Sequence, residues 1–173
     1  MAQTANNTHT TAPDSYGANG NSGLPTQYNV VLNYPAAATT TYYARDLVTV
    51  STSAGTISKC SGKASVFDGV VMDYVDNSAG AAGDKYVPVL VKGFVEVNGF
   101  VEATGETEDD TITYNDLVYL SADSAGVGAG QKVTALNSTS TVVGRALDYA
   151  VSTTSDKNIV LRVYIDCLSK SFS

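Results

Sequence analysis

Large apolar residues occur along this chain in short runs separated by glycine, asparagine, aspartate and small polar residues. Short runs rich in β-branched and aromatic side chains, bounded by turn-forming residues, predict β-strands. The expected strands cover residues 28–34, 47–50, 56–60, 67–74, 86–97, 100–103, 111–114, 117–120, 132–136, 141–149 and 158–165. No segment keeps the 3.6-residue period of an amphipathic helix over several turns, so we expect an all-β protein.

The expected strand at residues 86–97 contains two residues that disturb regular pairing. Pro88 has no N–H to donate to a ladder, which favours an edge position or a bulge. Gly93 favours a bend. The dipeptide Asn98-Gly99 follows, and this pair is typical of a type I′ turn between two antiparallel strands. We therefore predict that the chain reverses its direction at Asn98-Gly99.

Three blocks of sequence occur twice in the same order, at nearly constant spacing. The pairs are residues 46–51 with 116–121, residues 69–75 with 144–150, and residues 84–91 with 156–163, at offsets of 70, 75 and 72 residues. Small insertions in the intervening turns explain the drift between these offsets. The pattern predicts an internally duplicated β domain at residues 28–173, with one module at about 42–103 and a second at about 111–168.

The segment that precedes this domain, residues 1–27, contains mainly Asn, Thr, Ala, Gly, Ser and Pro. Such a composition cannot bury enough apolar area to offset an ordering entropy of roughly 1–2 kcal/mol per residue. We expect an extended N-terminal arm that is flexible alone and becomes fixed when a neighbouring subunit holds it.

The charge of the chain excludes several classes of partner. Its net charge is −7, and its ten Lys and Arg residues are scattered rather than gathered in a stripe. Binding to nucleic acid or to an anionic membrane needs clustered basic residues, so we expect neither partner. No apolar run approaches the 18 residues of a membrane span, and no basic and apolar start indicates a secretory signal. We expect synthesis in the cytoplasm of a host cell.

The residues needed for catalysis or metal binding are sparse. The single histidine, His9, lies in the arm, so a nucleophile paired with a histidine base is not expected. Cys60 and Cys167 lack the spacing of a zinc site, and we expect both to be reduced, although the sequence leaves open whether they meet in space. We expect neither enzymatic activity nor a cofactor nor a bound metal.

Aspartates recur at equivalent positions of the two modules. Asp46 and Asp116 each precede a strand, which predicts a role in turns. Asp73 and Asp148 would serve as an acid and base pair only if they faced a common cleft, and duplication alone explains their recurrence. The acidic loop at residues 106–110 has three readings: a solvated linker, a contact with basic residues of a partner, or a calcium site.

The repeated motifs resemble the small head-decoration, or cement, proteins of tailed phages. The motifs are residues 46–48, Ile57 with Lys59, residues 67–73 and residues 87–93, and the resemblance covers roughly residues 43–166. It implies a β-barrel or β-tulip fold and attachment to the major capsid protein on the outside of an icosahedral shell. It also implies a homotrimer without enzyme activity or cofactor. The arm and the strand at 28–34 lie outside the repeated pattern.

The function that follows is a structural virion protein, located on the outer capsid surface, that reinforces the shell by bridging capsid subunits. An extended segment can add a strand to the sheet edge of a neighbour. The candidate contacts with the capsid or with another subunit are Tyr28, Asn29, Val30, Val31, Leu32, Tyr34, Glu106, Glu108, Asp109 and Asp110.

An alternative function is a virion-surface or extracellular β module that binds a host receptor or a glycan. The chain has eleven tyrosines and no tryptophan. A glycan-binding module would gather several tyrosines on one exposed face, whereas a cement protein would use most of them in packing.

Overall fold

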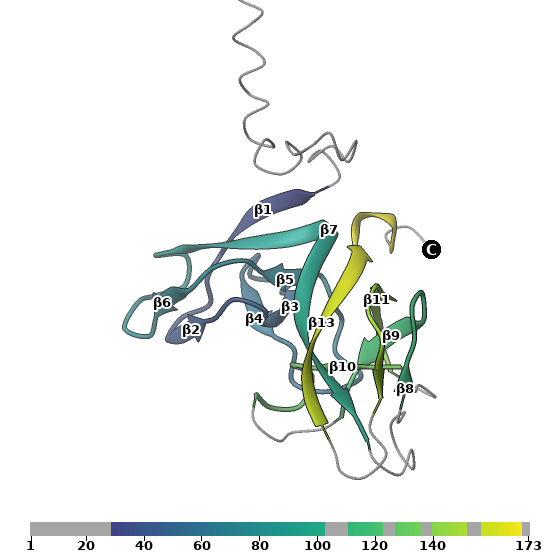
Figure 1. The fold of residues 1–173 in the computed structure, drawn as a ribbon. Helices are drawn as coiled ribbons and strands as arrows, with labels where there is room; N and C mark the ends of the chain where they lie inside the picture. Colours follow the sequence, from purple (N-terminus) through teal and green to yellow (C-terminus); the bar gives the residue numbers. More distant parts are fainter. Residues whose placement is uncertain (1–28, 103–110, 123–126, 136–139, 152–156, 171–173) are drawn as a thin grey trace, which may run out of the picture. The chain divides into compact units, whose positions relative to one another are not determined.

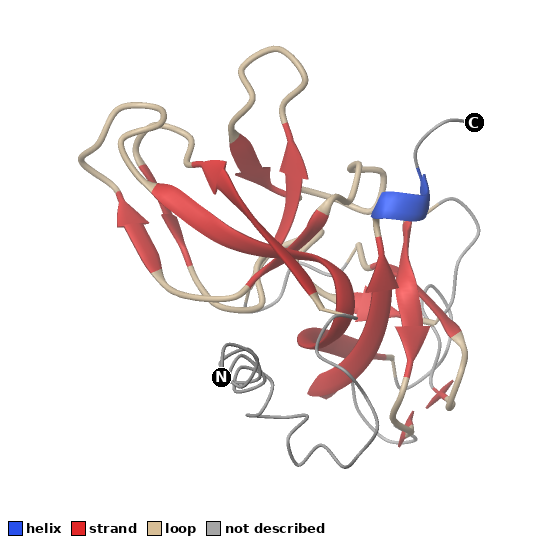
Figure 2. Ribbon diagram, turned by 90° about the horizontal axis from the view of Figure 1, so that it is seen from above, coloured by secondary structure: helices blue, strands red, loops and turns tan. Residues whose placement is uncertain are grey.

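The computed structural model describes residues 29–102, 111–122, 127–135, 140–151 and 157–170 (Figure 1). The chain divides into two units, residues 1–30 and 31–173, and in the first unit only Asn29 and Val30 are described. The strands are β1 Val30–Pro35, β2 Thr40–Tyr42, β3 Leu47–Val50, β4 Ile57–Lys59, β5 Gly69–Val71, β6 Val75–Asn77, β7 Tyr86–Val101, β8 Thr111–Ile112, β9 Leu117–Leu120, β10 Val133–Thr134, β11 Val142–Ala146, β12 Ala150–Val151 and β13 Lys157–Asp166. The described residues add one 3-10 turn, Leu168–Lys170 (blue in Figure 2), so the predicted all-β class is confirmed.

Five strands close into a barrel in the C-terminal part of the chain. Their order is β7, β13, β11, β9 and β10, and β10 pairs back onto β7. The longest ladder joins β7 and β13, from Lys92 opposite Asp166 to Val101 opposite Lys157. A parallel pairing of Val133 with Gly99 closes the ring. We call this closed set the second barrel.

The N-terminal part of the unit repeats this arrangement. β4, β3, β5 and β7 are neighbours in that order, and β1 pairs with the free side of β7. Ala36, directly after β1, forms a parallel bridge with Ile57 of β4 and so closes the ring. β7 belongs to both rings and bends at Gly93, whose φ is 131°. We call the ring of β1, β7, β5, β3 and β4 the first barrel.

The two barrels also share their strand registers. Leu47 faces Val70 as Leu117 faces Arg145, and Val70 faces Leu90 as Arg145 faces Tyr164. The small pairs β2–β6 and β8–β12 match in the same way. In these registers Leu90 corresponds to Tyr164, so the third block is offset by 74 residues rather than the 72 expected from the sequence. The two offsets differ by two residues, and a shift of two residues along a strand keeps each side chain on the same face of the sheet. The duplication itself stays a prediction, while the registers define which positions are equivalent.

β1 has a place in this pattern that its sequence does not reveal. The bridge of Ala36 to Ile57 corresponds to that of Gly99 to Val133, so β1 takes the position of the C-terminal half of β7. Residues 30–35 share no identical residue with residues 93–98 at this alignment. The sequence of this strand therefore stays outside the repeated pattern, while its pairing gives it a place in the repeated arrangement of strands.

The predicted turn at Asn98-Gly99 is wrong. Both residues lie inside β7, where Asn98 faces Val160 and Gly99 faces Ile159. A Cβ on Gly99 would lie 2.9 Å from a side-chain carbon of Ile159, so this glycine permits a close approach of strands. A local turn signal is overruled here by ladders on both sides of the strand.

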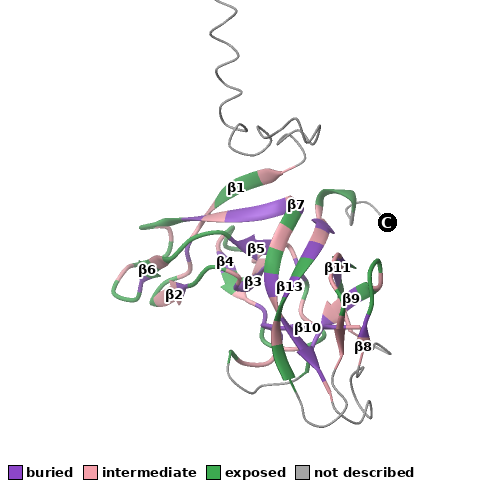
Figure 3. Ribbon diagram, in the orientation of Figure 1, coloured by how far each residue is buried: buried purple, intermediate pink, exposed green. Residues whose placement is uncertain are grey.

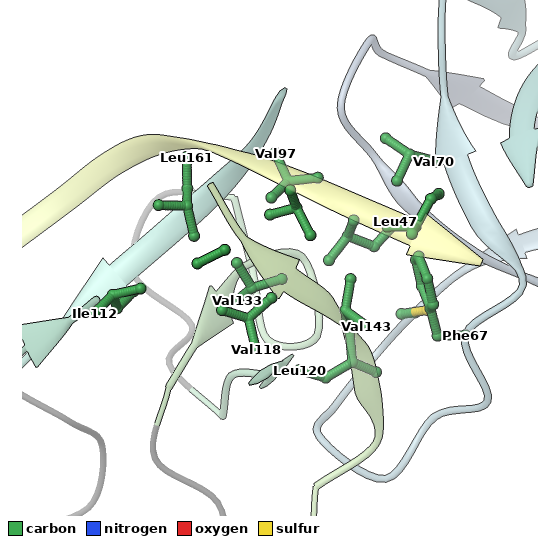
Figure 4. Packing of buried hydrophobic residues seen from close by; sticks show 14 of the residues in the cluster. Leu47, Phe67, Val70, Val97, Ile112, Val118, Leu120, Val133, Val143 and Leu161 are labelled. Carbon is green, nitrogen blue, oxygen red and sulfur yellow. The ribbon is translucent and has the colours of Figure 1, made fainter. Parts of the chain in front are cut away.

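The core shows how the barrels pack. Residues that point into the first barrel, such as Val48, Val71 and Val89, are fully buried, as expected for its interior. Their neighbours Leu47 and Val70 point outward and are also fully buried. Figure 3 shows buried positions in purple on β5 and β7. The outward residues belong to one cluster with the interior of the second barrel, including Leu120 and Val143 (Figure 4). The outer face of the first barrel therefore packs against the second barrel.

Tyr42 provides a test of the first barrel's interior. Its side chain is fully buried, its hydroxyl donates to the Ile57 carbonyl at 2.6 Å, and it accepts from the Ala37 N–H at 3.0 Å. Replacing Tyr42 with Phe leaves both backbone groups without this partner, so we expect a loss of about 1–3 kcal/mol in unfolding free energy. Urea denaturation measures the loss, and Tyr43→Phe, at an exposed ring, should leave stability unchanged.

Candidate binding surface

Four residues of the predicted contact set, Val30, Val31, Leu32 and Tyr34, lie on β1, and Asn29 directly precedes it. Asn29, Val30 and Tyr34 are half-buried. Val31 and Leu32 are 45% and 39% exposed. Successive residues of a strand point to opposite faces, so β1 is open to solvent on both faces at this point. Tyr28, Glu106, Glu108, Asp109 and Asp110 lie outside the described residues, so the structure does not place the acidic loop beside β1.

β1 is an edge strand among the described elements. β7 is its strand partner, and the bridge to β4 begins only at Ala36, after β1 has ended. An edge strand presents a row of backbone N–H and C=O groups that can pair with another chain. At the C-terminal end of β1, burial raises the pKa of the Tyr34 hydroxyl, and the nearby Asp68 carboxylate raises it further.

The outer face of the β7–β13 ladder has paired aromatic and charged side chains. Phe94 and Tyr164 face each other across the ladder, with ring centroids 5.2 Å apart. Lys92 Nζ lies 2.9 Å from an Asp166 carboxylate oxygen. Glu96 forms an ion pair with Arg45 of the first barrel. Pairs of side chains therefore hold one another in place on this face, and each of these side chains is exposed or half-buried.

The recurring aspartates have the structural roles that the sequence favours. The Asp46 and Asp116 carboxylates accept the N–H groups of Tyr43 and Thr113 at 2.8 and 2.7 Å, which confirms the predicted turns. The Asp148 carboxylate forms an ion pair with Arg162. In the described part of the chain, no group of three or more His, Cys, Asp or Glu side chains is arranged to hold a metal ion.

The ion pairs of the second barrel predict an acid-sensitive contribution to stability. Hydrogen bonds from Arg162 and Lys92 lower the pKa of Asp148 and Asp166, respectively. A lowered carboxyl pKa stabilises the fold above the unfolded value of about 4, and the contribution is lost as pH falls through the folded pKa.

We expect the wild-type melting temperature to drop below about pH 4. The drop should be smaller in Asp148→Asn, which has already lost the ion pair. Asp73→Asn is the matched control at the equivalent position, where the carboxylate accepts the Tyr74 N–H. A pH profile of melting temperature measures the difference. Identical profiles for wild type and Asp148→Asn would contradict it. The effect is small because these side chains contact solvent.

Two features of the structure were not predicted from the sequence. One is a hollow of about 450 Å³ at the end of the first barrel, lined by Thr49, Val50, Ser51, Thr52, Ser58, Val66 and Asp68. The other is the buried amide of Gln131, which bonds to Leu47 at a separation of 84 residues. Neither has a local sequence signal, because each depends on segments that are distant in the chain.

The structure also bears on the cysteines, on membrane spans and on the tyrosines. Neither Cys60, which is buried, nor Cys167, which is half-buried, forms a disulfide bond. Among the described residues, no helix has the length and apolar character needed to cross a membrane. Tyr43 and Tyr74 form one exposed aromatic pair, with centroids 5.5 Å apart and Lys59 Nζ 5.0 Å from the Tyr43 ring.

Comparison with solved structures gives a distant likeness. No protein-family model and no curated protein matches the chain. The chain is similar to a solved structure of the head fiber gp8.5 N base in bacteriophage phi29, with 16% sequence identity and a TM-score of 0.48. The likeness covers 80% of this chain and 96% of that chain. A likeness at this level does not establish a common fold or a common function.

Proposed function

We propose that this protein is a structural virion protein that binds the outer surface of an assembled icosahedral capsid. In this role it reinforces the shell by bridging neighbouring subunits of the major capsid protein. The proposal comes from the repeated motifs that resemble phage head-decoration proteins. It is supported by the exposed edge strand β1, where both Val31 and Leu32 contact solvent. It does not depend on the likeness to the phi29 protein.

The edge of β1 supplies a physical mode of attachment. One side of β1 is used by β7 of the same chain, and its other side can receive a strand from a capsid subunit. Backbone hydrogen bonds then give affinity, while Val31 and Leu32 select the side chains of the added strand. The arm at residues 1–27 would add a second point of attachment. Linked sites gain effective concentration, so several weak contacts can bridge a shell firmly.

Replacing Leu32 with Lys tests this mode of attachment. Lysine on an edge strand disfavours the addition of another strand, and Leu32 is exposed, so the fold should be retained. We expect Leu32→Lys to bind weakly to capsids assembled from the major capsid protein of the parent virus. Co-sedimentation with these capsids measures binding. Val160→Lys, at a side chain that is 49% exposed on β13, is the matched control.

Wild-type binding by Leu32→Lys would contradict attachment through β1. A version that lacks residues 1–28 separates the contribution of the arm, because it retains all of β1. Failure of the intact protein to bind any such capsid would overturn the capsid proposal itself.

A host-directed function has one supporting observation, the exposed Tyr43–Tyr74 pair beside Lys59. Aromatic faces of this kind could stack on a sugar ring. Saccharide binding that is lost in Tyr74→Ala would favour this second function over attachment to a capsid. A pair is a smaller feature than the multi-tyrosine face that a glycan-binding module would present, so we place it second.

A further inference from the structure

The contact between the two barrels involves one surface from each. The first barrel contributes an outer row across β3, β5 and β7, formed by Leu47, Val70 and Leu90, each no more than 1% exposed. The second barrel contributes one of its ends, which includes Leu120 and Val143. Ser121 and Thr134 at this end are also buried, at 0% and 1% exposed. We call these two surfaces the outer row and the barrel end.

Three further contacts lock the outer row of the first barrel to the end of the second. The Gln131 amide oxygen accepts the Leu47 N–H at 2.9 Å, and its amide nitrogen donates to the carbonyls of Leu47 and Cys60 at 2.8 and 2.7 Å. The Thr141 N–H donates to the Lys63 carbonyl at 2.9 Å. Gly130 approaches Gly62 so closely that a Cβ would lie 2.4 Å from its backbone nitrogen. The two surfaces are therefore joined by hydrogen bonds and by one close approach of the backbone, in addition to apolar packing.

Each barrel should possess both surfaces, because the registers are equivalent. The outer row of the second barrel is formed by Leu117, Arg145 and Tyr164, which face one another across β9, β11 and β13. Leu117 is 37% exposed, Arg145 is exposed and Tyr164 is half-buried. No described segment of the chain covers this row as the second barrel covers the first.

The end of the first barrel is open in the same sense. The positions equivalent to Leu120, Ser121, Thr134 and Val143 are Val50, Ser51, Ser58 and Asp68, and these are half-buried or exposed. They line the hollow of about 450 Å³, beside which Val66 is 63% exposed. Asp68 is held at this hollow because its carboxylate accepts the Val50 N–H at 2.7 Å.

At one position on each surface, the residues of the open surfaces differ from those of the covered surfaces by a charge, and the two charges are opposite. Within the chain, the outer row contributes Val70 and the barrel end contributes Val143, both in the apolar cluster. At the equivalent open positions, the outer row has Arg145 and the barrel end has Asp68. An apolar position on each surface has therefore been replaced by opposite charges, while Leu117 keeps the leucine of Leu47.

We propose that the outer row of the second barrel of one copy docks onto the open end of the first barrel of another copy of this chain. In this arrangement Arg145 pairs with Asp68, and Leu117 and Tyr164 cover the hollow beside Val66. The contact uses, between chains, the positions equivalent to the outer row and the barrel end that pack within each chain. It is heterologous, because different surfaces meet, so it generates a closed ring or an extended filament.

This contact goes beyond capsid attachment, because it needs no shell and because no residue of β1 lines the hollow. Opposite charges across an interface set its orientation and exclude mismatched partners. Placing two like charges at the same point opposes association, which gives a test on the purified full-length protein. Capsid binding and self-association can therefore fail independently of each other.

The first test is Arg145→Glu, which places two carboxylates opposite each other. The Arg145 side chain is exposed and donates to the Asn115 carbonyl, so its loss should leave the melting temperature close to that of the wild type. Sedimentation velocity over a wide concentration range should show wild-type species heavier than the 18.0 kDa monomer and a monomeric Arg145→Glu variant. Lys157→Glu, an equal change of charge at an exposed residue of β13, should associate like the wild type.

The second test restores the contact with the opposite change on the other surface. Asp68→Lys alone should also be monomeric, because it meets Arg145. An equimolar mixture of Arg145→Glu and Asp68→Lys should associate again, since each contact between one variant and the other then joins opposite charges. If Asp68→Lys melts early because Val50 loses its hydrogen bond, the exposed Val66→Lys replaces it. A wild-type protein that stays monomeric, or a mixture that stays monomeric, overturns the proposal.

Discussion

Replacing Gly130 with Ala should lower the unfolding free energy by about 2–5 kcal/mol, from left-handed strain and overpacking together. The φ angle of Gly130 is 76°, a region that disfavours side chains. A Cβ there would also lie 2.4 Å from the Gly62 nitrogen and 3.0 Å from the Cys60 carbonyl carbon. Both obstacles are backbone atoms, so relief requires the two barrels to move apart.

The chain supplies a matched control for this prediction. Gly55 occupies the corresponding turn of the first barrel and has a φ angle of 68°. A Cβ added to Gly55 would have no neighbouring atom within 4 Å. Gly55→Ala should therefore cost only the left-handed strain, about 1–2 kcal/mol. Urea denaturation of both variants isolates the cost of the close approach. Equal losses at the two glycines would show that the barrels do not pack at Gly130 as described.

Replacing Gln131 with Met should cost about 2–4 kcal/mol, because buried backbone groups lose hydrogen-bond partners. Gln131 is 4% exposed, and its amide bonds to the backbone of Leu47 and Cys60. Met keeps the length and volume of the side chain but none of these hydrogen bonds. The substitution changes no residue in the interior of either barrel, so we expect the loss to report on the contact between the barrels.

Gln131→Glu separates the roles of the two ends of the amide. At neutral pH its carboxylate can still accept the Leu47 N–H but faces the two carbonyl oxygens, so we expect it to be less stable than Gln131→Met. Protonation at low pH supplies a donor and should reduce the difference between the two variants. Thermal unfolding at several pH values measures this. A Met variant with wild-type stability would contradict the role of Gln131 as a lock.

The repeated sequence blocks predict much of the fold. The offset of 70 that relates Asp46 to Asp116 is the offset between β3 and β9, and the offset of 75 relates β5 to β11. Local patterns fail where tertiary pairing decides the outcome. Asn98-Gly99 carries a turn signal and lies in a strand that is paired on both sides. β1 shares a pairing pattern with β7 without sharing residues, because ladders are formed by the backbone.

The candidate surface is less predictable than the fold. The sequence correctly predicts turn roles for Asp46 and Asp116. It does not predict that the side chains of Val31 and Leu32 are exposed to solvent. Comparison of the modules does contain one usable signal. Val70 is apolar where its equivalent is Arg145, which indicates that one copy of this position is covered and the other is open. The placement of Gln131 depends on partners 84 and 71 residues away, a separation that no local pattern encodes.

The single strand β7 has a mechanical consequence. Its sixteen residues form a wall of the first barrel and then a wall of the second, without a break in the chain. Dividing the chain anywhere between Tyr86 and Val101 leaves at least one barrel incomplete, so the two barrels are not separable domains. A force applied to β1 is transmitted to β13 through β7, which pairs with both strands. Under load, the two barrels should therefore yield together rather than one after the other.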